Sequence, residues 1–567
     1  MTRMRPFFLV FCCLGLMSGI AQPGSYPRGY FRHPLNIKME IVANFGELRT
    51  NHWHMGLDIR TQQRENLPVY ASAEGYIAKV KIEPGGFGRA IYINHPNGYT
   101  TLYAHLNNFE PRLEQFVKEQ QYKSESWAVE LTIPRQLFPV RKGDFIAYSG
   151  NTGGSAGPHV HFEIRETATD KCLNALQFGF PLADNVPPGI TRLALYDRTQ
   201  SVYHQNIRFY SLKKVGNKYG LIKGNTIKTG SNRISFAISA FDRLSGTTNP
   251  NGIYAARTFV DGQLVSSFTL DRIDYNETRY MNAHIDYKMK MSGGPFVQHL
   301  SPMPGDTTTV YSDGDGIIYL NDTVPHKVSV EVLDAYLNTS LIEFYVQHDK
   351  QLDKGSSFTQ KQFIPGQVNI FEGENFEVFT SEYAVYDTVN INHTVTQSYS
   401  SNPISPQHTF LSYLIPSHDM VTVRIRPSTL LTEETRDRVV IQCISGTRKI
   451  VQKAQWNSGW LWARFRNFGS YQAFVDTIAP SINSLGFGDT INLSKATRIV
   501  FTPTDNFNSI KTFRAELNSK WLMFTNDKGK TWIYRFDEHF PAGVHQLKVM
   551  VEDEAGNRTT RSWWVRR

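Results

Sequence analysis

The stretch that decides the fold is Gly157-Pro158-His159-Val160-His161-Phe162-Glu163-Ile164, in which polar and apolar residues alternate. Alternation of this kind is typical of a β-strand, where residues i and i+2 project from the same face. We therefore expect His159 and His161 on one face of a strand. Side by side, one imidazole can hold a metal ion while the other reaches a water molecule. A pair of histidines is a weak signal alone, so its surroundings decide its meaning.

Two further segments extend this pattern. The first is His54-Met55-Gly56-Leu57-Asp58, with an imidazole and a carboxylate four residues apart, and both are good zinc ligands. The second is the strand-like run Thr101-Leu102-Tyr103-Ala104-His105. Six of the 17 histidines fall within about 110 positions, namely those at 52, 54, 95, 105, 159 and 161. This density favours a metal site.

Together these residues resemble the lysostaphin-type, LytM-like zinc metallopeptidases, which cut peptide bonds in bacterial peptidoglycan. The resemblance covers about residues 40 to 180 and runs through its segments in the same order. Besides the segments quoted above, it includes Asn44-Phe45-Gly46-Glu47-Leu48-Arg49, Pro68-Val69-Tyr70-Ala71 with Gly75, Gly85-Gly86-Phe87-Gly88, Gly143-Asp144 and Ser149-Gly150-Asn151-Thr152-Gly153.

The resemblance implies a fold, a cofactor and a site. The fold is an antiparallel β-sheet domain, and the cofactor is one Zn²⁺ bound by His54, Asp58 and His161, with an open position for water. His159 is the implied general base. His105 is implied either to orient the water or to stabilise the developing oxyanion. All five positions hold the residue type that the family uses, which argues against an inert member.

Two nearby histidines are expected to be structural. His95 lies beside the hairpin turn Pro96-Asn97-Gly98. His52 precedes His54 by two residues and could instead support a ligand or line the groove.

An insertion over about residues 107–140 separates His105 from Gly143. Leu113, Phe116 and Val117 have helical spacing within 111–124, and alternating residues predict a strand over 127–133. The insertion is either a surface elaboration or a wall that narrows the groove or gates entry to it.

The chain as a whole is predicted to be mostly β, because 13% of its residues are aromatic and 41 are glycine. We expect a LytM-like domain over 22–182 and three β-modules after it, over 183–349, 350–475 and 476–567. The first and last of these modules are expected to be immunoglobulin-like sandwiches. The middle module is predicted from alternating runs at 422–425 and 439–444.

An internal repeat supports the first and last modules. Asp184, Pro188, Ile190 and Leu193 recur with the same offsets as Asp476, Pro480, Ile482 and Leu485. The strand ending His326, Val330, Val332, Asp334, Asn338 and Ser340 likewise recurs as His545, Val549, Val551, Asp553, Asn557 and Thr559. We interpret the first set as domain openings, and the second as a strand followed by a D-x-x-x-N turn at each domain ending.

Two short motifs in the modules are interpreted as turns. Asp313-Gly314-Asp315-Gly316 resembles the start of a calcium loop, but Ile317 occupies the next ligand position. Residues 525–532, Thr-Asn-Asp-Lys-Gly-Lys-Thr-Trp, resemble an Asp-box hairpin, and a single copy cannot make a propeller.

The first residues predict export. Arg3 and Arg5 precede an apolar run over 7–20, which is typical of a secretory signal peptide over 1–21. The run is short of the ~20 residues that span a bilayer, and no later segment reaches that length, so no transmembrane segment is expected in the mature chain. Cys172 and Cys443 remain after cleavage, either as a disulfide or as two thiols.

The net charge of +9 comes from 60 basic and 51 acidic residues that are dispersed along the chain, so nucleic-acid binding is not expected. Two functions remain. The first is an exported zinc endopeptidase acting on peptidoglycan peptides. The second is a non-catalytic envelope scaffold that activates another cell-wall hydrolase, with protein partners bound through the β-modules. The expected location is the periplasm, with secretion or the cell surface as alternatives.

Overall fold

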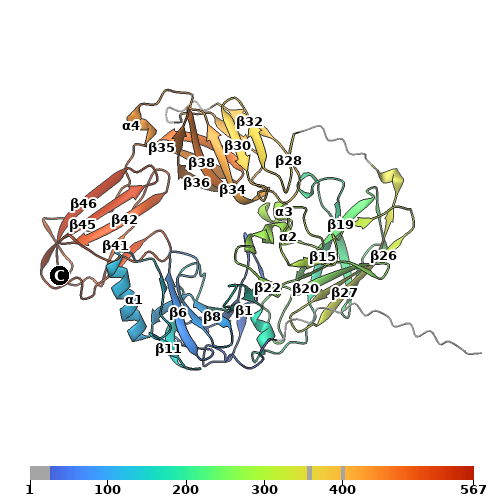
Figure 1. Cartoon of the computed structure of the whole chain (residues 1–567), viewed down its shortest axis with the longest axis horizontal. Coiled ribbons are helices and arrows are strands. Elements are labelled where there is room, and N and C mark those ends of the chain that lie inside the picture. Colours follow the sequence, from blue (N-terminus) through green and yellow to red (C-terminus); the bar gives the residue numbers. More distant parts are fainter. Residues whose placement is uncertain (1–25, 354–360, 398–402) are drawn as a thin grey trace, which may run out of the picture.

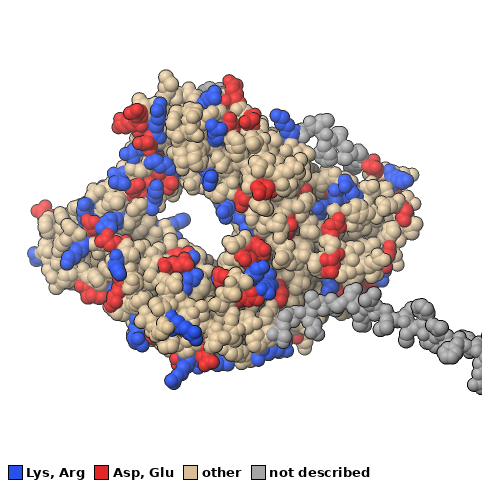
Figure 2. Space-filling view, in the orientation of Figure 1, with Lys and Arg blue, Asp and Glu red and all other residues tan. Residues whose placement is uncertain are grey.

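The computed structural model describes residues 26–353, 361–397 and 403–567, and it is built mostly from β-strands, as expected. The β-rich parts of the chain are arranged around a central opening (Figure 1), and side chains of both charges intermingle on the face that Figure 2 shows. Within the described ranges, no helix combines the length and the apolar character that crossing a membrane requires. The predicted signal peptide, residues 1–21, lies outside the described residues.

The amino-terminal part is built on an antiparallel sheet with the strand order β1-β4-β13-β8-β7-β6-β10. Val160, Phe162 and Ile164 point from β13 into the hydrophobic core beneath the sheet, so His159 and His161 face the other side. The strands are β1 (Ile41–Ala43), β4 (Leu57–Arg60), β13 (His159–Glu166), β8 (Tyr99–Ala104), β7 (Arg89–Asn94), β6 (Gly75–Ile82) and β10 (Val129–Thr132).

The insertion contains the expected helix and a strand. Helix α1 (Pro111–Lys123) begins after Glu110, whose carboxylate accepts hydrogen bonds from the backbone N–H groups of Arg112 and Leu113. Strand β10 extends the sheet at β6. The remaining short elements of this part are β2 (Leu48–Arg49), β3 (His52–Trp53), β5 (Pro68–Tyr70), β9 (Leu106–Phe109), β11 (Pro139–Val140), β12 (Phe145–Ser149), β14 (Cys172–Leu173) and the 3-10 helix η1 (Ala175–Phe178).

The next part is a sheet with the order β23-β19-β15-β16-β17-β27-β26-β20-β21-β24, to which β18 and β25 add. It is joined to the first part through β22 (Arg272–Ile273), which pairs with β14. Its elements are β15 (Gly189–Asp197), η2 (Val202–His204), β16 (Arg208–Val215), β17 (Lys218–Leu221), β18 (Thr226–Thr229), β19 (Arg233–Phe241), β20 (Ala255–Val260), β21 (Gln263–Thr269), η3 (Thr278–Tyr280), α2 (Met281–His284), α3 (Tyr287–Met291), β23 (Gln298–His299), β24 (Tyr311–Ser312), β25 (Ile318–Tyr319), β26 (His326–Leu333), β27 (Thr339–His348) and η4 (Lys350–Leu352).

The third part contains two five-stranded sheets, β29-β30-β34-β38-β37 and β32-β33-β39-β35-β36. A single hydrophobic cluster runs through this part and the preceding one, and it takes in Phe45, Trp53 and Met55 of the amino-terminal part. The elements are β28 (Gln362–Phe363), β29 (Asn369–Glu372), β30 (Phe376–Thr380), β31 (Val389–Asn390), β32 (His393–Thr396), β33 (Gln407–Phe410), β34 (Pro416–Ile425), α4 (Glu433–Arg436), β35 (Val439–Ser445), β36 (Arg448–Lys453), β37 (Gln455–Asn457), β38 (Trp460–Asn467) and β39 (Gly469–Val475).

The carboxyl-terminal part has its own core and a sheet with the order β40-β46-β45-β42-β43, beside the pair β41 and β44. Its strands are β40 (Thr490–Asn492), β41 (Arg498–Phe501), β42 (Ile510–Leu517), β43 (Lys520–Trp521), β44 (Trp532–Arg535), β45 (Val544–Asp553) and β46 (Arg558–Arg566). The domain boundaries at 183, 350 and 476, and the immunoglobulin-like class of the first and last modules, stay predictions.

The carboxyl-terminal part returns to the amino-terminal part and closes the ring of Figure 1. The hairpin over 525–532 contributes to this contact: the Lys528 ammonium donates to the carbonyls of Asn151 (2.7 Å), Gly153 (2.8 Å) and Ser155 (3.1 Å). The backbone N–H of Gly153 donates to Asp527 Oδ1 at 2.7 Å. A turn that the sequence suggested was merely local is therefore an interdomain contact.

Cys172 and Cys443 are both buried free thiols. Of the two alternatives left open by the sequence, the unpaired one is correct.

Gly56 is required where β4 meets β13. A Cβ at Gly56 would lie 2.4 Å from the carbonyl oxygen of Phe162 and 3.1 Å from Cε1 of His161, whereas a Cβ at Gly157 would meet nothing within 4 Å. We expect Gly56→Ala to lower the free energy of unfolding by about 1–3 kcal/mol, because backbone must move to admit the methyl group. Gly157→Ala is the matched control, with an expected change within about 0.5 kcal/mol. Urea unfolding of both variants checks this, and equal midpoints would contradict it.

Candidate metal centre

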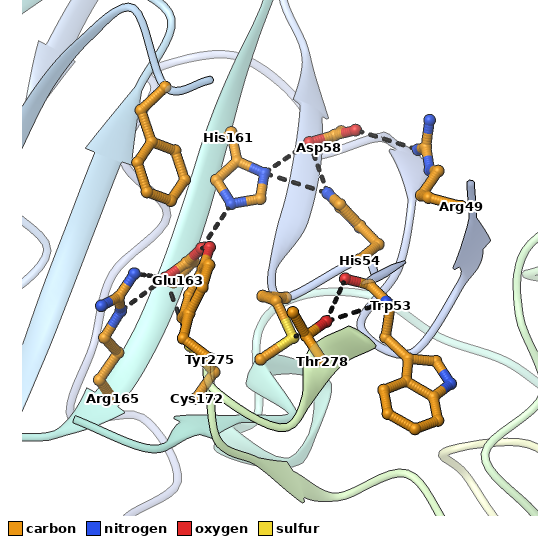
Figure 3. A network of polar contacts seen from close by, with 12 residues as sticks. Arg49, Trp53, His54, Asp58, His161, Glu163, Arg165, Cys172, Tyr275 and Thr278 are labelled. Atoms are coloured by element: carbon orange, nitrogen blue, oxygen red, sulfur yellow. Dashed lines mark hydrogen bonds and ion pairs between the residues drawn. The ribbon is translucent and has the colours of Figure 1, made fainter. Parts of the chain in front are cut away.

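The three predicted metal ligands are brought together by two neighbouring strands. In the antiparallel pairing of β4 with β13, Asp58 lies directly opposite His161, so their side chains are cross-strand neighbours on one face. Leu57 and Ile59 point into the core on the other face. His54 comes from the turn before β4, and Figure 3 shows it reaching the same point. All three ligands are buried.

Their donor atoms are already arranged as a set. His54 Nε2 lies 2.9 Å from Asp58 Oδ1 and 3.0 Å from His161 Nδ1, and His161 Nδ1 lies 2.9 Å from the same carboxylate oxygen. The other ring nitrogen of each histidine is engaged: Nδ1 of His54 donates to the carbonyl of Asn44, and Nε2 of His161 donates to Glu163. The nitrogens that face the centre are therefore the ones left to bind a metal, and two imidazoles with one carboxylate fit a divalent metal such as zinc.

The charges of the centre stabilise one another. Burial alone would raise the pKa of Asp58, but the charge of His54 and the neighbouring imidazoles of His159 and His161 hold that pKa well below its ordinary value. Burial alone would lower the pKa of His161, but hydrogen bonds to Asp58 and Glu163 raise it to about 9. A metal ion that binds here must therefore displace a proton from His161.

A buried layer behind the ligands fixes His161. Glu163, two residues on in β13 and fully buried, accepts hydrogen bonds from His161 Nε2 (2.8 Å) and from the Tyr275 hydroxyl (2.7 Å). Arg165 Nη2 lies 2.6 Å from the same carboxylate. Burial opposes the charge of Glu163, but Arg165 and His161 together lower the pKa of Glu163 to about 2. Tyr275 comes from the part of the chain after residue 183, so two parts of the protein build this centre (Figure 3).

The sequence analysis missed this layer, although it named the ligands. Glu163 and Arg165 could have been found, because residues 161, 163 and 165 share one face of β13. Tyr275 carries no such signal, since it is 112 residues from Glu163 and reaches it only through the packing of two parts. Arg49 was missed as well, and its guanidinium lies 3.4 Å from Asp58 Oδ2.

The two histidines predicted to act on water lie beside the ligands. The ring centroids of His105 and His159 are 4.7 Å apart, and His159 Nε2 lies 3.4 Å from Asp58 Oδ1. His105 follows β8 in a left-handed backbone conformation (φ +59°), and its N–H donates to the carbonyl of Phe87. This corner turns the chain into β9 and places the imidazole beside His159. All five predicted site residues are therefore close together.

The other two of the six clustered histidines, His95 and His52, make different contacts. Both ring nitrogens of His95 are engaged inside the domain, with the carbonyl of Glu74 and the hydroxyl of Thr101. His52 is exposed, and its Nδ1 contacts the carbonyl of Thr50.

Comparison with known proteins identifies two segments of the chain. Residues 52–123 match Peptidase family M23, and residues 360–476 match the Zu5-like domain. The chain is 35% identical over 141 residues to "DD-carboxypeptidase/endopeptidase Mpg" of Neisseria meningitidis, covering 25% of this chain and 24% of that protein. It is 29% identical over 169 residues to "Peptidoglycan DD-endopeptidase ShyA" of Vibrio cholerae, covering 29% and 33%. The matches thus span about a quarter to a third of these curated relatives.

Two solved structures are also similar to part of this chain. A zinc-containing peptidase from Vibrio cholerae is 26% identical, with 27% of this chain and 41% of that chain covered and a TM-score of 0.21. The catalytic domain of lysostaphin from Staphylococcus simulans is 22% identical, with 27% and 91% covered and a TM-score of 0.16. The amino-terminal part of this protein, with its His-Asp-His centre, therefore contains a LytM-like domain of peptidase family M23.

Proposed function

We propose that this protein is an exported, zinc-dependent endopeptidase that hydrolyses peptide bonds in peptidoglycan. The observation that carries the proposal is the convergence of the three donor atoms of His54, Asp58 and His161 beside two further histidines. The names of the relatives that match this domain, a DD-carboxypeptidase/endopeptidase and a peptidoglycan DD-endopeptidase, support the substrate class. The amino-terminal pattern of residues 1–21 supports export, to the periplasm or beyond it.

His54, Asp58 and His161 would hold the zinc ion. When bound, zinc polarises the scissile carbonyl and lowers the pKa of a water molecule towards about 7. The residues of the chain then have to accept and return a proton.

The hydrogen bonds of His159 suit it to that task. The carbonyl of Gly157 can only accept, so the 2.8 Å contact places the proton of His159 on Nδ1 and leaves a lone pair on Nε2. That nitrogen faces Asp58 at 3.4 Å, on the ligand side of the ring. His159 is therefore positioned to take a proton from water at Nε2 and to pass it to the departing amine.

For His105 the same reasoning favours one of two roles. Its Nδ1 donates to the carbonyl of Thr152 at 2.8 Å. Burial, and then repulsion by His161 and His159, lower the pKa of His105 to about 3, so the ring is neutral near pH 7. A neutral ring with its proton on Nδ1 can accept a hydrogen bond at Nε2 and cannot donate one there. This supports His105 as a group that orients water rather than a donor to the oxyanion.

Substituting the proposed general base and a proposed metal ligand in turn should separate catalysis from metal binding. We expect His159→Ala to lower kcat by about 10²–10⁴-fold with one zinc still bound per chain, because a general base is lost. Asp58→Ala is the matched variant and should lose the zinc. Zinc content by metal analysis, with turnover on a peptidoglycan peptide, checks both. Full turnover in His159→Ala would contradict its role.

The support of His161 by the second part of the chain can be tested separately. Tyr275→Phe removes one hydrogen bond to Glu163 and should weaken zinc affinity by about 10–100-fold, since such supporting hydrogen bonds orient metal ligands. Tyr92→Phe is the control. The Tyr92 ring lies near the same group of residues, 5.3 Å from the Arg165 guanidinium. The described hydrogen bonds to Glu163, however, come from other residues, so this variant keeps them. Competition with a chromophoric chelator measures both affinities, and equal values would count against the link.

The reaction itself is best identified on intact sacculi. Incubation with the chain lacking residues 1–21 should release muropeptides with new termini, and a chelator-treated sample should release none. Mass spectrometry of the products would name the bond. If the two samples give the same profile, the scaffold function is favoured, and partner binding that survives Asp58→Ala would support it further.

A further inference from the structure

The internal repeat of the sequence corresponds to a repeated cluster of carboxylates. Oxygen atoms of Asp184, Asp242 and Asp334 lie within 4.8 Å of one another, and those of Asp476, Asp505 and Asp553 do the same. The first and last member of each trio are the aspartates that the repeat aligns, at a domain opening and in a D-x-x-x-N turn. We call the first group the 184 trio and the second the 476 trio.

The 184 trio lies where the M23 domain meets the next part of the chain. The hydroxyl of Tyr336, two residues after Asp334, donates to the carbonyl of Leu182 at 2.9 Å. The side-chain amide of Gln177 donates to the carbonyl of Ala335 at 2.8 Å. Tyr336 and Leu182 also pack against the core of the M23 domain. An interaction that holds the trio together therefore also fixes this junction between the M23 domain and the next part, which we call the joint.

No ion pair joins a carboxylate of the 184 trio to a basic side chain within residues 26–353, 361–397 and 403–567. In the described parts of the chain, the hydrogen bonds to Asp184 and Asp334 come from backbone N–H groups, the Ser245 hydroxyl and the Asn338 amide, all of them neutral. Burial, and then the charges of Asp334 and Asp184, raise the pKa of Asp242 to about 8. Ionised at neutral pH, the trio would carry three negative charges in a buried place.

Buried polar atoms without described partners lie in the trio and on a residue paired with it. Asp242 is 4% exposed, and its Oδ1 has no hydrogen-bond partner among the described residues; the same holds for Oδ2 of Asp184. Asn251 is also 4% exposed, and neither polar atom of its amide has a described partner. Asp242 and Asn251 exchange two backbone hydrogen bonds as an antiparallel pair (2.9 and 2.8 Å), so their side chains project from the same face. Buried oxygens without donors are what a cation would satisfy.

We propose that Asp184, Asp242 and Asp334 form a binding site for one Ca²⁺, with the Asn251 side-chain oxygen as a further ligand. All the donors are oxygen atoms, which hard cations prefer. Ca²⁺ accepts six to eight such ligands in irregular geometry, while Mg²⁺ keeps most of its water and is poorly suited to a buried site. The bound ion would tie β19, the D-x-x-x-N turn after β26 and the linker before β15 into one joint. This site is independent of the peptidase centre and its proposed function.

The test is calcium binding by the chain lacking residues 1–21, loaded with zinc and freed of calcium. Isothermal titration with CaCl₂ should show binding in the wild type, and Asp242→Asn should lose one equivalent of Ca²⁺. Asp505→Asn, the same change in the 476 trio, is the matched control and should leave the calcium site at Asp242 intact. A parallel titration with MgCl₂ should give no binding at the same concentrations. A wild type that binds no Ca²⁺ at 10 mM, above the range of about 10⁻⁴–10⁻³ M known for extracellular modules, would overturn the proposal.

Thermal unfolding gives a second readout, because calcium should reverse the order of the melting temperatures of the wild type and the variant. Without calcium, Asp242→Asn should melt above the wild type, because an amide of the same shape avoids the cost of charging or protonating the buried carboxyl in the folded chain. With saturating calcium the order should reverse, since only the wild type gains from the ion. Asp184→Asn should behave in the same way. The same order of melting temperatures with and without calcium, or an unchanged calcium stoichiometry in both variants, would contradict the site.

Discussion

The pairing of β4 with β13 is the constraint on which the rest of the structure depends. Its register sets Asp58 opposite His161, while Leu57 and Phe162 point to the core on the other side. A slip by one residue would exchange the two faces, burying the ligands in the core and exposing the apolar residues. Gly56 permits this register, because the carbonyl of Phe162 occupies the space where a Cβ would stand. The arrangement of the proposed ligands and the hydrophobic core beneath them are thus specified by the same set of backbone hydrogen bonds.

The M23 domain is not an independent unit in this chain. Its proposed ligand His161 is oriented by Glu163, and Glu163 in turn is held by Tyr275 from the following part. Phe45, Trp53 and Met55, which flank the ligand-bearing turn, pack in the hydrophobic cluster of the later modules. A buried carboxylate needs partners to stay ionised, and here one partner comes from outside the domain. The β-modules therefore contribute to the electrostatics of the metal centre as well as to the architecture.

The sequence predicted what local pattern can encode. Alternation identified β13, helical spacing identified the helix of the insertion, and the family resemblance named five residues that the structure brings close together. Tyr275, Lys528 and Asp242 escaped, because each acquires its role through contacts more than 50 residues away that no periodicity records. The repeat did locate Asp184 and Asp334, but as marks of domain edges. Their closeness to Asp242 depends on how three separate segments meet.

The contact of Lys528 with the segment 151–155 has a consequence for the order in which the protein is completed. One ammonium group from the last 40 residues binds three carbonyl oxygens in the segment that leads to His159. During synthesis, that segment is made 374 residues before its partner arrives. A chain that stops short of residue 525 leaves those carbonyls to water. The ammonium group of Lys528 can therefore support residues 151–155, beside the metal centre, only in chains that extend as far as Lys528.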